Sequence, residues 1–195
     1  MSLSPGQLRL ERVRCAWRPY RRGDAAEPQV RTWLEDTLGL APEALVLQRS
    51  AHGRPQFGAP PQSRDVSWSH SGDGLLMALG EDVRLGCDLE WLRPRPRALE
   101  LARRYFTTAE ADRLAALAPA RREAAFVRLW CAKEAVLKAY GRGIAFGLHR
   151  LEFGERDGAL ALLACDPALG APADWTLHGF VPAPGYLATL AWRIP

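Results

Sequence analysis

The sequence predicts an α+β fold for this chain of 195 residues. Three observations support this expectation. Short strand-like runs dominate the first half, helical runs follow a proline-rich connector at residues 93–97, and strand-like runs return after residue 150. Strands and helices that gather in separate stretches are typical of α+β proteins, whereas alternating βαβ units build parallel sheets. We place the boundary between two α+β halves at residue 95, which gives subdomains 1–95 and 96–195.

The first half is expected to contain one helix and five strands. Glu27–Leu38 has Pro28 in its first turn, where proline is tolerated, and Gly39 directly after its end. Turns rich in Gly, Pro, Ser or basic residues are expected at 18–23, 58–61 and 71–74. The expected strands are residues 12–17, 45–48, 65–68, 75–79 and 84–91.

The second half is expected to begin with helices and to end with strands. The connector at 93–97 reads Arg-Pro-Arg-Pro-Arg and cannot be helical in its middle, because proline lacks the backbone N–H. Thr107 or Thr108 is the expected helix cap, with Glu110 in the first turn. The expected helices are 99–105, 108–116 and 121–140, and the expected strands are 151–153, 159–163, 175–181 and 186–192.

Composition excludes several classes of protein. Hydrophobic residues make up 48% and charged residues 25%, as in ordinary soluble proteins. No apolar run approaches the ~18 residues of a membrane span, and the first 18 residues do not read as a secretory signal. Four scattered cysteines without a C-x-x-C pair argue against a zinc site and against a disulfide framework. We expect a cytoplasmic monomer that binds neither membranes nor nucleic acid.

Charge indicates the kind of partner. The net charge of +4 favours an anionic partner, but it is modest for a nucleic-acid-binding protein. Phosphorylated cofactors and acidic protein surfaces fit this charge equally well.

Lysine is confined to one predicted helix. Lys133 and Lys138 are the only lysines among 26 basic residues, and Glu134 lies between them. An ammonium is a compact point charge, whereas the arginine guanidinium is a broad planar fork. The pattern suggests a site for a metal ion and a phosphate. The alternative is an exposed Glu134–Lys138 pair worth about 0.2–0.5 kcal/mol.

The predicted strand 84–91 carries two carboxylates. Asp88 and Glu90 are two residues apart, so they project from one face of a strand. Two like charges there are costly unless a cation offsets them. Oxygen ligands favour Mg²⁺ over Zn²⁺. The alternative is an edge strand with a solvated acidic face.

Two further segments display anion-binding groups. Arg54 lies in a Gly-Arg-Pro turn, and Ser69 with His70 lies at the end of a predicted strand. Serine, histidine and free backbone N–H groups form anion-binding corners. A Ser/His nucleophile pair is disfavoured, because the two residues are sequence neighbours and no G-x-S-x-G elbow is present. The alternative for the Arg54 turn is an ordinary loop.

Four motifs occur in a family-specific order. They are Gly53-Arg54-Pro55, Ser69-His70-Ser71-Gly72, Gly86-Cys87-Asp88-Leu89-Glu90, and Trp130-x-x-Lys133-Glu134-Ala135-x-x-Lys138 followed by Gly141 and Gly143. In this order and spacing the chain resembles the 4'-phosphopantetheinyl transferase superfamily, in its two-subdomain, surfactin-synthetase-activator-like type. The resemblance covers about residues 21–192.

The resemblance implies a fold and a reaction. The fold would be two similar α+β subdomains related by a pseudo-two-fold, with the active site in the cleft between them. The reaction would transfer the 4'-phosphopantetheine arm of coenzyme A to a serine of an apo acyl or peptidyl carrier protein with an acidic docking surface, releasing 3',5'-ADP. Mg²⁺ would be required, with Mn²⁺ as the alternative ion.

Each candidate residue then receives an expected role. Asp88, Glu90 and Glu134 would hold the metal ion. Glu134 would also remove the serine proton, and Lys138 would stabilise the leaving group. The residues expected to bind coenzyme A are Arg22, Arg54, Ser69, His70, Lys133 and Lys138, with Arg22 at the adenosine-end phosphate.

Three other functions remain open. A Mg²⁺-dependent phosphohydrolase would share the carboxylates but would release free phosphopantetheine without a carrier protein. A non-catalytic coenzyme A or nucleotide sensor would bind without Mg²⁺. An RNA-binding module is the weakest alternative, because RNP-type aromatic strands are missing from the sequence.

Overall fold

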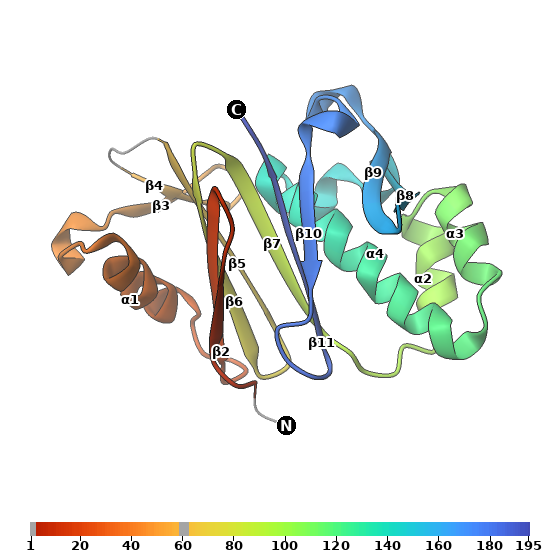
Figure 1. Ribbon diagram of the computed structural model, residues 1–195, viewed down its shortest axis with the longest axis horizontal. Helices are drawn as coiled ribbons and strands as arrows, with labels where there is room; N and C mark the ends of the chain where they lie inside the picture. Colours follow the sequence, from red (N-terminus) through yellow and green to blue (C-terminus); the bar gives the residue numbers. More distant parts are fainter. Residues whose placement is uncertain (1–2, 59–62) are drawn as a thin grey trace.

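The computed structural model describes residues 3–58 and 63–195 and confirms the α+β class (Figure 1). Its α-helices are α1 Glu27–Leu38, α2 Ala98–Tyr105, α3 Thr108–Ala115 and α4 Pro119–Tyr140. Its strands are β1 Gly6–Arg9, β2 Val13–Pro19, β3 Leu47–Arg49, β4 Pro55–Phe57, β5 Arg64–Ser71, β6 Gly74–Glu81, β7 Arg84–Trp91, β8 Leu151–Arg156, β9 Ala159–Cys165, β10 Thr176–Phe180 and β11 Tyr186–Arg193. In the described ranges, no helix is long and apolar enough to cross a membrane.

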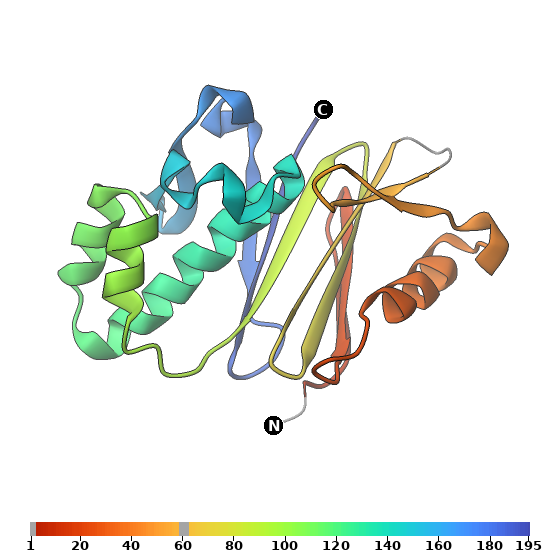
Figure 2. The same ribbon diagram turned by 180° about the vertical axis from the view of Figure 1, so that it is seen from behind.

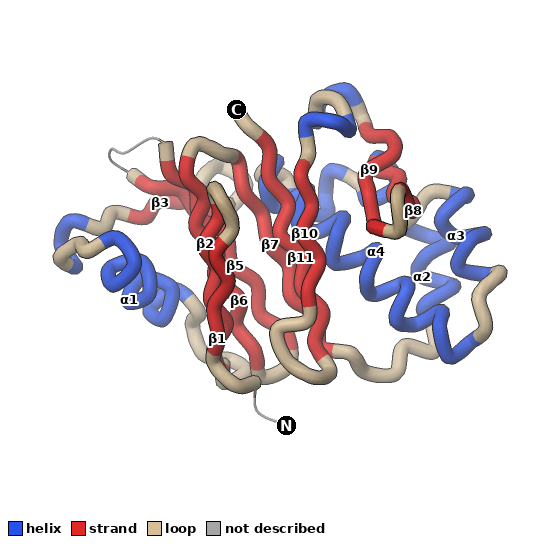
Figure 3. The backbone as a smooth tube through the Cα atoms, in the orientation of Figure 1, coloured by secondary structure: helices blue, strands red, loops and turns tan. Residues whose placement is uncertain are grey.

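Two antiparallel sheets and two helical layers build the molecule (Figures 1 and 2). The first sheet has the order β1-β2-β6-β5, and the second has the order β10-β11-β7. Helix α1 covers the outer face of the first sheet, while α4 packs against β7 and β11 of the second. The pairs β3–β4 and β8–β9 form separate two-stranded ribbons, shown as red segments in Figure 3.

Strand β6 separates two cores by simple alternation. Leu75, Met77 and Leu79 point toward α1, and Leu76 and Ala78 point toward the second sheet. Successive side chains of a strand face opposite sides, so a continuous apolar run is expected for a strand that is covered on both faces. A third core, around α4, joins α2 and α3 to the β8–β9 ribbon.

A polar seam joins β5 to β7. These edge strands belong to different sheets, and side chains of β5 accept hydrogen bonds from β7 backbone N–H groups. Leu85 donates to Asp65 (2.7 Å), Cys87 to Ser67 (3.0 Å) and Trp91 to Ser71 (3.0 Å); these atoms are N–Oδ2 in the first pair and N–Oγ in the others. Every buried N–H needs a partner. The alternating polar residues of β5 therefore replace a missing strand ladder.

Gly86 lets α4 approach β7 closely. A Cβ atom at this position would overlap Ala135 O and would lie 2.5 Å from Ala139 N. Both are backbone atoms of α4, so no side-chain rotation could relieve the overlap. A glycine here brings the helix with Glu134 and Lys138 against the strand with Asp88.

Several predicted boundaries differ from the structure. Strand β1 was not predicted, and β5 continues to Ser71, three residues beyond the expected end at 68. The expected turn at 58–61 falls largely on residues 59–62, which lie outside the described residues. The subdomain boundary at residue 95 stays a prediction; strand β7, which precedes it, pairs with β11, which follows it.

Candidate active site

Asp88, Ser69 and Lys138 meet at the seam between β5, β7 and α4. The Asp88 Oδ1 atom accepts hydrogen bonds from Ser69 Oγ (2.8 Å) and from Lys138 Nζ (2.7 Å). Lys138 Nζ also donates to Ser69 Oγ over 2.9 Å. Asp88 is only 4% exposed. Three predicted site residues from three distant segments are therefore brought into direct contact.

Glu90 lies two residues further along β7 and has its own partners. Its Oε2 atom accepts hydrogen bonds from Arg95 Nη2 (2.6 Å) and from Ser71 Oγ (3.3 Å). Burial, followed by the nearby Asp88 carboxylate, raises the pKa of Glu90, although Arg95 opposes this shift.

Glu134 faces the same carboxylates from α4. It precedes Lys138 by four residues, so the two side chains share one helix face. Burial, and then repulsion from Asp88 and Glu90, raises the pKa of Glu134 to about 7. A carboxyl group with this pKa can accept a proton near neutral pH, as a general base must.

Lys138 is the cation of this cluster. Burial is the largest single influence and lowers its pKa, but attraction to Asp88, Cys87 and Glu134 and the hydrogen bond to Asp88 together outweigh burial, so the pKa is raised. Its side chain remains 29% exposed. The Lys138 side chain is therefore charged and partly exposed, while its amine is bonded to Asp88 and Ser69.

The donor set fits a hard divalent cation. Asp88 Oδ2 is buried and has no hydrogen-bond partner among the described residues. The Glu134 carboxylate accepts no hydrogen bond from the described residues, and burial, followed by repulsion from Asp88 and Glu90, raises its pKa. Within residues 3–58 and 63–195, however, no three His, Cys, Asp or Glu side chains are gathered as a ready ligand set. Metal binding at Asp88, Glu90 and Glu134 thus requires a side-chain rearrangement.

Arg54 is held inside the protein. Its guanidinium pairs with Asp65, and it donates to Lys138 O (2.9 Å, from Nε) and to Leu85 O (3.0 Å, from Nη2). These bonds tie the end of α4 to β5 and β7. Nη1 of Arg54 is buried without a partner. Among the described residues, Nη1 is therefore the one guanidinium nitrogen of Arg54 that is left for the predicted contact with a phosphate.

A pocket of about 210 Å³ opens beside Arg54 and Lys138. Gly141, Gly143 and Trp68 also line it, and the Arg49 guanidinium lies 4.8 Å from the centroid of the Trp68 ring. The pocket combines a cationic rim with an aromatic surface next to the carboxylate cluster.

Lys133 does not reach this cluster. It is fully buried on another face of α4, where its Nζ pairs with Glu110 Oε2 at 2.8 Å. It also donates to Leu148 O (2.9 Å) and to Leu151 O. The prediction that Lys133 contacts coenzyme A therefore has no support in its position, because adjacent residues of a helix point in different directions.

His70 and Arg22 lie away from Asp88. His70 neighbours Ser69 on β5 and so points to the opposite face, where its ring stacks on Tyr20 at 4.7 Å. Arg22 is exposed in the turn that begins after Tyr20. The turn and His70 are adjacent, but their predicted contacts with coenzyme A stay predictions.

Three residues of the site were missed at the sequence level. Arg95 lies in the expected connector, Asp65 in an expected strand and Ser71 in the expected turn at 71–74, and none of the three was assigned a role at the site. The alternation Asp65-x-Ser67-x-Ser69-x-Ser71 was the available signal, because it marks one polar face of a strand.

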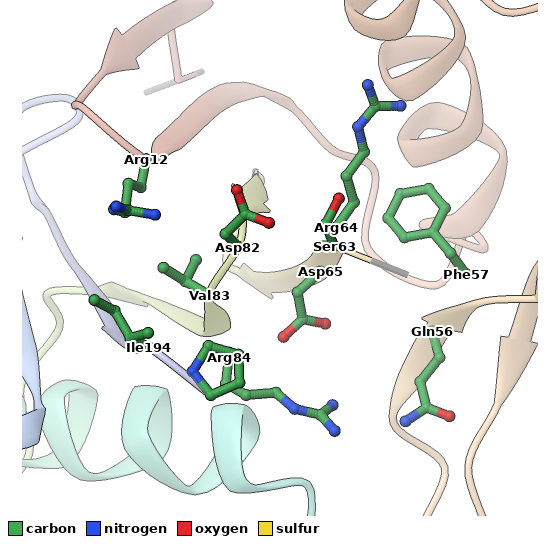
Figure 4. Close-up of a pocket in the computed structure, with 11 residues that line it drawn as sticks. Arg12, Gln56, Phe57, Ser63, Arg64, Asp65, Asp82, Val83, Arg84 and Ile194 are labelled. Carbon is green, nitrogen blue, oxygen red and sulfur yellow. The ribbon is translucent and has the colours of Figure 1, made fainter. Parts of the chain in front are cut away.

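A larger pocket of about 560 Å³ lies at the other end of β5 and β7 (Figure 4). Arg12, Arg64 and Arg84 surround it together with Asp65 and Asp82. None of the predicted catalytic or metal-binding residues lines it. Its size therefore does not make it the better candidate for the active site.

Comparison with known proteins identifies relatives of this chain. The sequence pattern of the 4'-phosphopantetheinyl transferase superfamily matches residues 84–191. The chain is 34% identical to the 4'-phosphopantetheinyl transferase HetI of Nostoc sp., over 88% of this chain and 70% of that protein. It is 33% identical to the 4'-phosphopantetheinyl transferase psf-1 of Bacillus pumilus, over 66% of this chain and 53% of psf-1.

A Synechocystis sp. protein described as a 4'-phosphopantetheinyl transferase is 34% identical over 63% of this chain and 50% of its own length. The chain thus spans about half the length of the Synechocystis and Bacillus pumilus relatives. The matched residues include β7 and α4, which carry the carboxylate cluster.

Proposed function

Because this chain belongs to the 4'-phosphopantetheinyl transferase superfamily, we propose that it transfers the 4'-phosphopantetheine arm of coenzyme A to a serine of an apo carrier protein. The other product is 3',5'-ADP. The observation that carries this proposal is the contact of Asp88, Ser69 and Lys138 beside a Glu134 whose pKa is about 7.

In the proposed reaction, the serine oxygen attacks the pyrophosphate phosphorus that bears the pantetheine arm. A new P–O bond forms to serine, and the P–O bond to 3',5'-ADP breaks. Glu134 is the proposed acceptor of the hydroxyl proton, because it is the carboxylate that α4 places beside Lys138 and Asp88. Lys138 offsets the charge that develops on the leaving phosphate.

Asp88, Glu90 and Glu134 are the residues that would hold Mg²⁺, with Mn²⁺ as a possible substitute. When bound, a divalent ion would neutralise the pyrophosphate oxygens. The buried, partnerless Oδ2 of Asp88 supports this assignment. Ser69 would keep Asp88 oriented through its 2.8 Å hydrogen bond.

Coenzyme A is proposed to bind with its nucleotide end in the pocket lined by Trp68 and Arg54. Lys138 also lines this pocket, and its amine would meet the pyrophosphate. His70 and Arg22 would contact phosphate at the adenosine end. Lys133 is left out of this set because its amine is bonded within the protein interior.

The wider expectations also belong to this proposal. Two similar subdomains related by a pseudo-two-fold would place coenzyme A in the cleft between them. The acceptor would be an acyl or peptidyl carrier with an acidic docking surface, which suits the net charge of +4. The monomeric state and the cytoplasmic location stay predictions.

Intact mass spectrometry of carrier proteins tests this function. The protein is incubated with coenzyme A, Mg²⁺ and a panel of apo acyl and peptidyl carriers, and each carrier is then weighed. At least one carrier should gain one phosphopantetheine group, and Asp88→Asn should abolish the gain without changing the melting temperature. The proposal fails if no carrier is modified, or if Asp88→Asn modifies carriers at the wild-type rate in the presence of a chelator.

A further inference from the structure

Arg95 forms an ion pair with Glu90, one of the three carboxylates of the proposed metal site. It belongs to the connector between β7 and α2, and its Nη2 lies 2.6 Å from Glu90 Oε2. The two side chains are 22% and 17% exposed, so the ion pair is largely shielded from water. The connector is anchored next to this pair, because Arg95 N donates to Glu123 Oε2 of α4 over 2.8 Å.

The guanidinium of Arg95 is only partly bonded. An arginine has five N–H donors, yet among the described residues its side chain makes one hydrogen bond, to Glu90. Its Nε is buried without a partner. Arg54, in contrast, has carboxylate and carbonyl partners on two of its nitrogens. Arg95 is thus held mainly by Glu90, and loss of that one bond would free it.

The three carboxylates of the proposed metal site also differ in their cationic partners. Asp88 is bonded to Lys138, Glu90 is bonded to Arg95, and Glu134 has no cationic partner within salt-bridge distance in the described residues. The three carboxylates are not gathered as a ligand set. A divalent ion at this site would need Glu90, whose Oε2 is committed to the guanidinium.

We propose that Arg95 is an internal competitor of the metal ion for Glu90, and that it sets the metal affinity of this protein. This inference rests on the proposed function, since it assumes that Asp88, Glu90 and Glu134 hold the ion. Binding of Mg²⁺ or Mn²⁺ displaces Arg95 from Glu90 and lets the carboxylate turn toward Asp88. The opposite role, a brace that holds Glu90 ready for the metal, predicts the opposite effect of removing Arg95.

Mn²⁺ titration followed by electron paramagnetic resonance separates these roles without any measurement of catalysis. The 195-residue chain is titrated in the absence of coenzyme A. Arg95→Gln should bind Mn²⁺ at least about tenfold more tightly than the wild type, which corresponds to about 1.4 kcal/mol. Unchanged or weaker binding would overturn the inference.

Arg97→Gln is the matched control. Arg97 lies in the same connector and also pairs with a carboxylate, but its partner is the exposed Glu100. The substitution removes the same charge and should leave Mn²⁺ affinity unchanged. A tenfold gain in this control would attribute the effect to overall charge and would overturn the inference.

A double-mutant cycle tests whether the effect acts through Glu90. In a Glu90→Gln background, Arg95→Gln should produce no further gain in affinity, because the contested carboxylate is gone. A gain that persists there would overturn competition. Should Arg95→Gln fail to fold, Arg95→Lys keeps the charge with a less suitable donor, and it should still bind Mn²⁺ more tightly than the wild type; equal affinity would count against the inference.

Failure of the proposed function gives a different result. If the wild type and every variant bind no Mn²⁺ at millimolar concentrations, the metal role of the three carboxylates falls, and this inference falls with it. If the wild type binds Mn²⁺ and modifies carriers but Arg95→Gln has wild-type affinity, only the role of Arg95 is wrong.

Discussion

Replacing Lys133 should lower the free energy of unfolding of the protein rather than the rate of the proposed reaction. Lys133→Met keeps the length of the side chain but leaves the Glu110 carboxylate buried without its cation, and both residues are 0% exposed. Removing one partner of a buried ion pair costs roughly 3–5 kcal/mol, because the remaining charge is uncompensated. In a domain of this size, such a loss lowers the melting temperature by about 10 °C.

The surrounding network explains why the loss cannot be absorbed locally. Glu110 Oε1 accepts a hydrogen bond from Phe153 N (2.8 Å), and Oε2 accepts one from Thr107 N (3.0 Å). Lys133 Nζ also lies 4.9 Å from the Phe106 ring centroid. The pair therefore joins the α2–α3 junction, α4 and β8, and water has no access to replace the ammonium.

Urea unfolding, followed by circular dichroism, measures the loss. The double variant Lys133→Met/Glu110→Gln removes the stranded charge and should regain part of the lost stability. Below its melting temperature, Lys133→Met should retain coenzyme A binding. A variant with wild-type urea stability but without coenzyme A binding would refute this reasoning and return Lys133 to the active site.

Three further predictions follow from the site. Lys138→Arg should lower kcat at least about tenfold, or 1.4 kcal/mol, because the wider guanidinium misaligns with a pyrophosphate; Arg150→Lys, at an exposed pair with Asp166, is the control, and unchanged kcat in Lys138→Arg would contradict the assignment. Without metal, Glu134→Gln should become more stable than the wild type as the pH rises from about 4.5 to 7, by up to about 3 kcal/mol. Because the pKa of Glu134 is raised in the folded state, the folded state still holds this proton between about pH 4.5 and 7 while the unfolded state has lost it, so the wild type loses stability as the pH rises through this range. Parallel pH–stability curves from thermal melts would contradict this. Gly86→Ala should cost about 1–3 kcal/mol and also reduce kcat, because it pushes α4 off β7, whereas Gly179→Ala, whose added Cβ has its nearest neighbour at 3.9 Å, should change neither melting temperature nor kcat.

The strand with the two carboxylates was predictable because its signal is local. Alternation along residues 84–91 placed Asp88 and Glu90 on one face, and the expected strand has the bounds of β7. Glu134 and Lys138 were also predictable as a pair, since residues four apart share a helix face. These local periodicities give side-chain direction but not the partner across the fold.

The sequence analysis missed contacts that depend on the direction of a side chain or on a partner from another part of the fold. Lys133 and Glu134 are neighbours on a helix and diverge by about 100°, so a single cluster of both with Lys138 was geometrically unfavourable. Arg54 is neutralised by Asp65, eleven residues later, through a contact that no sequence period encodes. Arg95 returns to Glu90 because the connector turns back on β7, which its proline content alone did not indicate.

The central claim is that phosphopantetheine moves from coenzyme A to a carrier serine. The most direct measurement follows 3',5'-ADP release and carrier mass in the same reaction, with an apo carrier and with its serine-to-alanine variant. The account predicts one 3',5'-ADP released for each carrier modified, and no release with the alanine variant or without a carrier. Release of 3',5'-ADP at the same rate without a carrier would contradict it and would identify a phosphohydrolase.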